Sequence, residues 1–338
     1  MSRWCIILVF LGLTAWSARL DAAQGPASSD PLARLISQWN LEEKVPDGLL
    51  AQKSLVVYGT GIGLPELEQA QQGFQRTGID AVLHLPADLV FAAPEVTQQV
   101  TEYMVKREIR FIIVLRRKEQ FYELVFAPFN GTSGWVTPGH SAWRVTGGEF
   151  RTIFESIGRV SASSQKKKNL LINEWPETEF VFQPIGRERN LNFMYRLNQE
   201  PLGVVRTGEA AFDEVVESTL REIYPYKVIF FEPLTPVKDM RAKKCLFVLR
   251  VVHTRASEAV RLLGFPASKD PQVVSGITFD SGKEAPSSVA SGSMVWKFFI
   301  QQTDNNALYL GNRWDADTDR IRALRNHLSA FRAWVNRK

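Results

Sequence analysis

Short strand-like runs alternate with amphipathic helical patterns along this chain, and this alternation limits the possible folds more than any other feature. The β-rich run 54–58 precedes a helical pattern that begins at Pro65 and ends at Gly78. An amphipathic helix over 95–107 then leads into the apolar run 110–115. Strands that alternate with helices form sheets covered by helices, so the sequence predicts the α/β class.

Two further patterns add antiparallel strands. The run 121–126 follows 110–115 across a charged turn, and the runs 295–301 and 307–310 flank a polar turn. Closely spaced strands of this kind pair as hairpins. We therefore predict mixed α+β sheets with packed helices, rather than a purely parallel, doubly wound fold.

The first residues have the layout of a secretory signal peptide. Arg3 provides a positive start, a nearly unbroken apolar run covers 5–13, and Ala15 and Ser17 occupy the positions that a signal peptidase reads. The apolar run is too short to span a bilayer. We expect residues 1–17 to be removed and the protein to be periplasmic or secreted, without stable membrane insertion afterwards.

Export and the cysteine count narrow the chemistry. Cys5 lies in the predicted signal peptide, so Cys245 would remain as a single cysteine without an intrachain disulfide. Its strand-like surroundings favour a buried, inert thiol. Nucleotide and nicotinamide pools lie inside the cell, so we expect no cofactor. The formal net charge of +5 is spread along the chain and predicts no nucleic-acid partner.

The length that remains after export is typical of two domains. About 320 residues exceed the usual size of one domain. We predict a flexible lead at 18–29, a first α/β domain at 30–160, a linker at 161–168 and a second α/β domain at 169–338. The linker begins with small polar residues and ends in a run of lysines.

Several landmarks recur in the two predicted domains at similar places in the order of strands and helices. The pairs are Val56 with Val204, Met104 with Met240, Leu115 with Leu249, and Trp143 with Trp314. Their spacing drifts, so insertions are needed to align them. A tandem duplication explains the pairs, and so does the small number of α/β patterns.

A glycine-rich turn follows the strand-like run 54–58. Gly59, Gly61 and Gly63 precede a helix, where main-chain N–H groups can hold an anion. Leu64 stands where a dinucleotide-binding motif needs glycine, and the Lys-Ser/Thr pair of a phosphate loop is missing. The pattern favours a tight turn between strand and helix, with an anion site as the alternative.

The segment 130–148 is predicted to be a long, glycine-rich loop that carries Trp135, His140 and Trp143. Long loops on a rigid frame often bind ligands, and tryptophan rings stack on ligands or anchor partners. These three residues are our candidate ligand-binding residues. The alternative is that the tryptophans pack into the core, which the counterpart Trp314 favours for Trp143.

No catalytic constellation is recognisable, and no metal site is predicted. The four histidines lack the spacing of metal ligands. Asp315, Asp317 and Asp319 resemble the start of a calcium loop, but the glycine that such a loop needs at its sixth position is Arg320. We predict that these acidic residues cap the last helix.

These observations favour an exported cell-envelope binding or assembly module without catalytic activity, acting through contacts with another envelope protein. One alternative is an exported hydrolase whose site assembles in space from His140 or His253 and nearby carboxylates. Another is a glycan-binding protein that uses Trp135 and Trp143. The sequence predicts neither the identity of the partner nor an oligomeric state.

Overall fold

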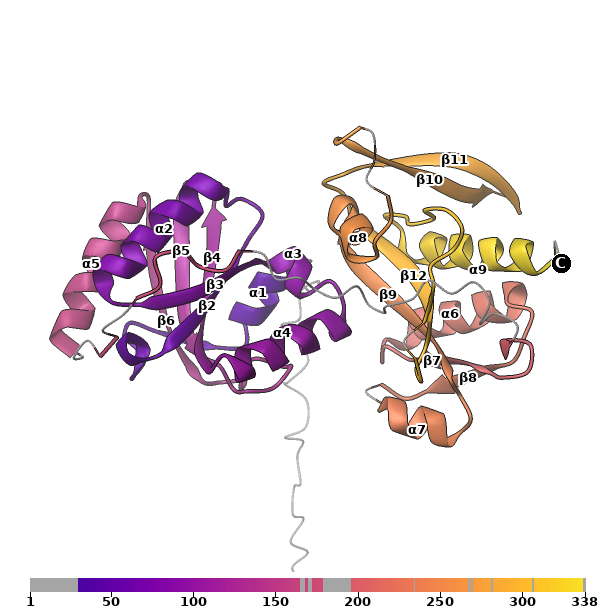
Figure 1. Cartoon of the computed structure of the whole chain (residues 1–338), viewed down its shortest axis with the longest axis horizontal. Coiled ribbons are helices and arrows are strands. Elements are labelled where there is room, and N and C mark those ends of the chain that lie inside the picture. The colour runs from indigo at the N-terminus through magenta and orange to yellow at the C-terminus, as the bar shows by residue number, and fades with distance from the viewer. Residues whose placement is uncertain are drawn as a thin grey trace, which may run out of the picture.

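The computed structural model of the protein describes residues 30–164, 168–169, 172–178, 196–233, 235–266, 268, 270–280, 282–305 and 307–336. The predicted signal peptide, 1–17, and the predicted lead, 18–29, lie outside these residues. The described chain is mixed α/β, as predicted, with two mixed sheets and a separate hairpin (Figure 1). None of the described helices is long and apolar enough to cross a membrane.

The first sheet has six strands in the order β1-β6-β5-β4-β2-β3. Its strands are β1 (Asn40–Glu42), β2 (Lys53–Tyr58), β3 (Asp80–Pro86), β4 (Ile109–Lys118), β5 (Phe121–Pro128) and β6 (Ser141–Gly147). Strands β2, β3 and β4 run parallel, whereas β5 is antiparallel to both β4 and β6. The strands predicted at 54–58, 110–115 and 121–126 are confirmed as β2, β4 and β5, each slightly longer than predicted.

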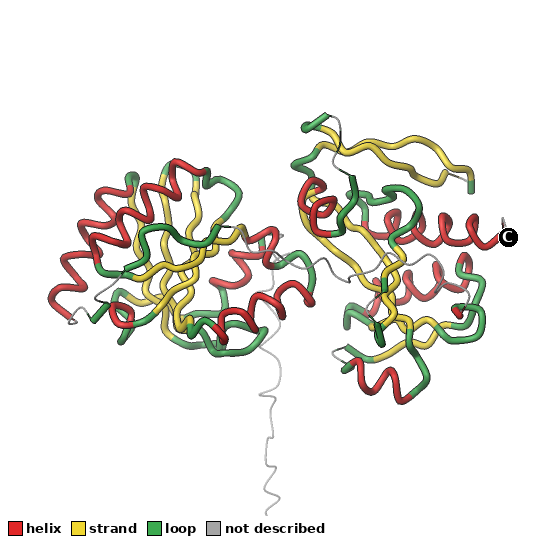
Figure 2. Tube along the Cα trace, in the orientation of Figure 1, coloured by secondary structure: helices red, strands yellow, loops and turns green. Residues whose placement is uncertain are grey.

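Helices cover both faces of the first sheet (Figure 2). One face carries α1 (Pro31–Ile36), α3 (Ala87–Val90) and α4 (Pro94–Lys106), and the other carries α2 (Leu64–Thr77), α5 (Phe150–Ser164) and the 3-10 helix η1 (Leu49–Ala51). Successive residues of β2 alternate between the two cores, because side chains of a strand point to opposite faces. Leu55 and Val57 pack with the first group of helices, and Val56 packs with the second.

The second sheet has five strands in the order β13-β12-β9-β7-β8. Its strands are β7 (Leu202–Val205), β8 (Val228–Phe231), β9 (Phe247–Arg255), β12 (Met294–Gln302) and β13 (Leu308–Tyr309). Strand β7 is parallel to β8 and β9, whereas β12 is antiparallel to β9 and β13. The separate antiparallel hairpin consists of β10 (Val273–Asp280) and β11 (Lys283–Ala290).

Four helices accompany the second sheet. They are α6 (Ala210–Ile223), α7 (Val237–Ala242), α8 (Ala256–Leu262) and α9 (Arg320–Asn336). Helices α6 and α9 share a core on one face, and α8 packs on the opposite face. Cys245 is buried, as predicted, and it packs beside Met240 of α7. Burial, as the main cause, and the charge of Glu200, as the second, raise the pKa of its thiol to about 12.

The two sheets are joined by an apolar contact. Four residues of α3, α4 and the turn between them are buried together with the α8 face of the second sheet; they are Leu89, Ala92, Ala93 and Val96. Two ion pairs flank this contact, Asp88 with Arg255 at 2.7 Å and Glu95 with Arg250 at 3.1 Å. The main-chain N–H of His253 also donates to the carbonyl of Ala92 at 2.9 Å. The first half of the chain therefore completes the core of the second.

The two sheets share one order of connections. The series β2-α2-β3-α4-β4-β5-β6-α5 matches β7-α6-β8-α7-β9-β12-β13-α9, apart from α3 before α4 in the first series and from α8 and the hairpin inserted after β9 in the second. Three of the four landmark pairs lie in equivalent elements, but Trp143 lies in β6 whereas Trp314 follows β13 in a loop. Since α/β connections follow few patterns, this likeness does not decide ancestry, and the tandem duplication stays a prediction.

Local signals account for the ends of the first two helices. The side chain of Asp30 caps α1 by accepting the N–H of Leu32 at 2.9 Å, with Pro31 at the first helical position. Gly78 ends α2 with φ at 89°, a left-handed conformation that glycine adopts without steric strain. The end of α2 at Gly78 is as predicted.

The acidic residues before α9 divide into two roles. Asp319 caps the helix as predicted, accepting the N–H of Arg322 at 2.7 Å. The prediction is wrong for Asp315, which is fully buried and faces Lys297 at 2.7 Å and His327 at 3.2 Å. The difference arises because a buried cation on another strand attracts this carboxylate away from the helix end.

The structure also differs from the prediction in three segments. Strand β6 occupies part of the predicted loop 130–148, and the hairpin β10–β11 lies in a region where no strands are predicted. Helix α5 continues to Ser164, so the predicted linker 161–168 begins as helix. The hydroxyl of Ser161 is buried and donates to the carbonyl of Ile157 at 2.6 Å, which satisfies it inside the helix.

The described residues between 168 and 178 contact the first sheet, although most of them belong to the predicted second domain. The N–H of Asn169 donates to the carbonyl of Leu50 at 3.0 Å. Glu177 exchanges main-chain hydrogen bonds of 2.9 Å with Val82 and His84 of β3. These residues therefore pack with the first sheet and its helices, and the domain boundaries stay predictions.

Candidate functional site

The strongest candidate site is a cleft at the carboxyl ends of β2 and β4. The chain crosses from β2 to β3 on one side of β2 and returns to β4 on its other side. In α/β sheets, such a switch point leaves a crevice in which ligands bind. A cavity of about 450 Å³ lies there, lined by the ends of both strands and by β9 and β12 of the second sheet.

Glycines bring the loop after β2 close to the end of β4. A Cβ on Gly59 would lie 3.4 Å from Cβ of Arg116, and one on Gly61 would lie 3.3 Å from Cβ of Arg117. The N–H of Gly59 donates to the carbonyl of Leu115 at 2.9 Å. The predicted tight turn between strand and helix is therefore confirmed.

Two of the three glycine N–H groups predicted to hold an anion at this turn already donate hydrogen bonds within the protein. Gly59 already donates its N–H to β4, and the N–H of Gly63 donates to the Glu66 carboxylate at 3.1 Å. Within the described ranges, the N–H groups of Thr60 and Gly61 have no acceptor. These two neighbouring donors, which line the cleft, are the ones that an anion could use.

Three consecutive cations at the end of β4 line the cleft. Arg116 is neutralised by the buried carboxylate of Glu123 at 2.5 Å, with Asp30 at 3.5 Å. Lys118 lies 3.8 Å from Glu123 and is half-exposed. Arg117 has no carboxylate partner in the part of the chain that the structure describes. Arg117, together with Lys118, whose ion pair with Glu123 is long and half-exposed, supplies the charge that a ligand could use.

The opposite wall of the cleft comes from the second sheet. Arg255 at the end of β9 pairs with Asp88 of α3 at 2.7 Å, and Met294 begins β12 beside it. His253 stacks on Trp296 with ring centroids 3.6 Å apart. Burial, together with the charges of Arg320 and Arg34, lowers the pKa of His253 to about 4, so its imidazole is neutral at pH 7.

The charged side chains of the cleft have a positive excess. Its lining includes Arg116, Arg117, Lys118 and Arg255, against the carboxylates of Asp30 and Asp88. A concave surface lined mainly by one sign of charge attracts ligands of the opposite sign. The cleft is therefore suited to an acidic group, held by charge-assisted hydrogen bonds from the cations and by the free amides of the turn.

Trp135 does not offer a ring face to a ligand. Its side chain is 0% exposed and packs beside Phe91, with ring centroids 5.2 Å apart. The indole Nε1–H donates to the hydroxyl of Thr101 at 2.8 Å, which satisfies its polar atom inside the core. The structure supports the packing alternative for this residue.

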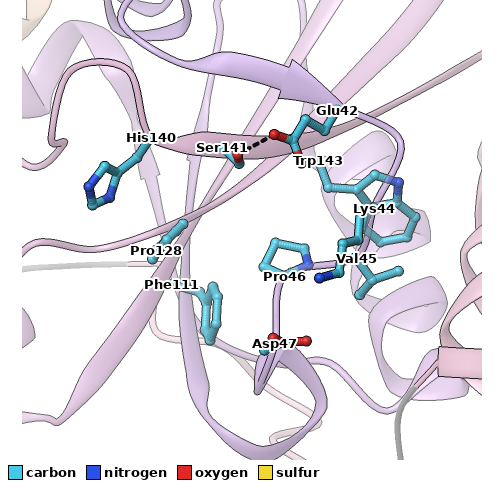
Figure 3. Close-up of a pocket in the computed structure, with 10 residues that line it drawn as sticks. All are labelled: Glu42, Lys44, Val45, Pro46, Asp47, Phe111, Pro128, His140, Ser141 and Trp143. Atoms are coloured by element: carbon cyan, nitrogen blue, oxygen red, sulfur yellow. Dashed lines mark hydrogen bonds between the residues drawn. The ribbon is translucent and has the colours of Figure 1, made fainter.

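His140 and Trp143 line a second cavity, of about 390 Å³, at the amino end of β4 (Figure 3). Trp143 is 3% exposed and packs on Phe126 of β5. The hydroxyl of Ser141 donates to the carboxylate of Glu42, while the imidazole of His140 points away from both (Figure 3). A ligand-binding role for His140 and Trp143 stays a prediction.

The histidines named for a hydrolase are not arranged as a catalytic base. In the described part of the chain, neither His140 nor His253 is paired with a carboxylate that could orient it. No three histidine, cysteine, aspartate or glutamate side chains among the described residues gather as metal ligands would.

Sequence reasoning missed the cationic wall of the cleft. The signal available was an apolar strand that ends in Arg116, Arg117 and Lys118, next to a glycine turn that follows another strand. The contribution of Arg255 had no local signal, because it reaches the cleft through the contact between the two sheets.

Comparison with known proteins identifies no relative among families or curated proteins. No protein family matches the chain, and no curated protein is significantly similar to it.

Proposed function

We propose that this protein is an exported binding module without catalytic activity of its own, and that its partner presents an acidic group to the cleft between the two sheets. One observation carries the proposal: the positive charge gathered at the switch point between β2 and β4. Ligands of α/β sheets bind at such points, and here the charge selects an anion.

The recognition would use donors from two chain segments, the end of β4 and the turn after β2. Arg117 and Lys118 supply charge, and the amides of Thr60 and Gly61 supply main-chain donors. Hydrogen bonds between ionised partners are about twice as strong as neutral ones. The half-exposed position of Lys118 makes the interaction sensitive to salt.

The partner we favour is another protein of the cell envelope that inserts an acidic segment into the cleft. The predicted export signal supports this setting, since such a signal would direct the protein out of the cytoplasm. The volume of about 450 Å³ is within the range of pockets that hold a ligand or a short side-chain cluster.

A charge-matched pair of variants tests the proposal. The probe is a fluorescently labelled glutamate-rich decapeptide, and its binding to the full chain is measured by anisotropy at low and physiological salt. Arg117→Ala/Lys118→Ala should weaken binding at least tenfold. Lys106→Ala/Arg110→Ala removes two exposed cations from α4 and the amino end of β4, outside the cleft, and should leave binding unchanged.

The outcome decides between a local site and general electrostatic attraction. Equal losses in the two double variants would show that net charge attracts the peptide, and the proposed site would be wrong. Absence of binding to the unmodified protein at low salt would also reject the proposal.

A further inference from the structure

We infer that the cleft takes a ligand with two acidic groups, and that Asp88 competes from within the protein for the cation that holds the second group. This inference rests on the function proposed above and specifies the ligand class of the same site. It follows from the distribution of charge over the two walls of the cleft.

The cations of the cleft lie on opposite walls. Arg117 and Lys118 belong to the end of β4 in the first sheet, whereas Arg255 belongs to the end of β9 in the second. A single carboxylate on the first wall uses only the charges of that wall. A ligand that uses both walls needs a second acidic group.

Asp88 already forms an ion pair with Arg255, the cation of the second wall. Its Oδ2 lies 2.7 Å from Nε of Arg255, and both residues line the cavity. A carboxylate in this position makes the contact that an acidic ligand would make. The internal ion pair therefore lowers the charge available to a ligand and reduces the advantage of a second acidic group.

The side chain of Asp88 is not needed to hold its own main chain in place. The hydroxyl of Thr254 donates to the carbonyl oxygen of Asp88 at 2.6 Å, and the apolar residues around Leu89 and Ala92 bury the contact between the sheets. Replacing the carboxylate by an amide keeps this backbone anchor and the size of the side chain. Asp88→Asn thus changes the charge at Arg255 with little change in packing.

The shared chemistry of the ligand is a pair of carboxylates, and this pair has two possible sources. A small dicarboxylate carries both on one short carbon chain, and a protein segment carries them on two acidic side chains. Succinate and a hexapeptide with one aspartate and one glutamate, blocked at both ends, represent the two sources. Acetate and the same peptide with a single glutamate are the one-carboxylate references.

Isothermal titration calorimetry on the full chain tests the inference through the ratio of two-carboxylate to one-carboxylate affinity. Asp88→Asn should raise that ratio about tenfold, because the amide no longer neutralises Arg255. Arg255→Gln should reduce the ratio to about one, because the second carboxylate then has no cation to bind. Glu95→Gln removes the other ion pair between the sheets, outside the cleft, and should leave the ratio unchanged.

The possible failures are distinguishable. If no acidic probe binds at all, the proposed function is wrong. If acidic probes bind through Arg117 and Lys118 but Asp88→Asn leaves the affinity ratio unchanged, only the inference is wrong. Should Asp88→Asn unfold the protein, Arg255→Gln still decides, since an unaltered ratio in that variant would refute a role for the second wall.

Discussion

The buried cluster of Lys297, Asp315 and His327 allows a quantitative test of how this fold is held together. All three side chains are 0% exposed, with Lys297 Nζ 2.7 Å from one oxygen of Asp315 and His327 Nδ1 3.2 Å from the other. Burial alone would raise the pKa of Asp315, but Lys297 and His327 outweigh burial, so the net pKa lies below its ordinary value. The carboxylate is therefore ionised at pH 7, and its charge opposes the lowering of the Lys297 pKa that burial causes.

Asp315→Asn would leave the buried ammonium of Lys297 without its counter-ion. Its remaining close contacts are the carbonyl of Phe298 at 2.6 Å and the His327 ring at 3.3 Å. Breaking a buried pair by removing one partner lowers the free energy of unfolding by about 3–5 kcal/mol. Lys297→Met in addition removes the uncompensated charge, so the double variant should be more stable than Asp315→Asn alone.

Urea unfolding at pH 7, followed by circular dichroism, is measured for the unmodified protein, for Asp315→Asn, for Lys297→Met and for the double variant. The four free energies of unfolding give the double-mutant coupling. We expect a coupling of about 2 kcal/mol or more between the two sites. Glu155→Gln is the control, because its partner Arg151 is exposed and the two make only a surface ion pair, which contributes little to stability. Additive effects, or a loss below about 1 kcal/mol in Asp315→Asn, would show that the cluster does not act as a buried ion pair.

Two other predictions concern the first sheet. Burial lowers the pKa of His84 to about 4, so the unfolded chain takes up a proton there below pH ~6.5 while the folded protein does not; stability should fall as the pH drops from about 6.5 to 4. His84→Leu should flatten that slope by about 1.4 kcal/mol per pH unit in urea titrations, and an unchanged slope would contradict the assignment. Gly73→Ala places a Cβ 2.0 Å from the ring of Phe154 and should destabilise the protein by about 1–3 kcal/mol in thermal and urea unfolding. Gly158→Ala, where the nearest atom is 3.8 Å away, is the matched control and should be neutral or stabilising.

The parts of the fold that sequence reasoning predicted are those with local signals. The strand before Gly59 and the helix that ends at Gly78 follow from periodicity and from residues adjacent in the chain. The hairpin β10–β11 was not predicted, because most residues of β11 are exposed and the strand therefore lacks the row of buried apolar residues that indicates a strand. Strand β6 was not predicted because glycines flank it and only Ala142 and Trp143 among its residues are buried.

The candidate site depended on information that a single sequence pattern does not contain. The glycine turn was visible, but the switch point requires the order of β3, β2 and β4 in the sheet. Asp88 and Arg255 are 167 residues apart in the chain, and their contact depends on how the two sheets meet. Lys297 likewise reads as an interruption of an apolar strand until Asp315 is placed beside it.

The way α3 and α4 seal the second sheet has a consequence for cooperativity. A fragment restricted to the second sheet would lose Leu89 and Val96 from the core cluster that also contains Val252, Val295 and Phe299. Such a fragment would expose more apolar surface and would also lose the two ion pairs between the sheets. The two halves, although each has its own sheet, should therefore melt together as one cooperative body.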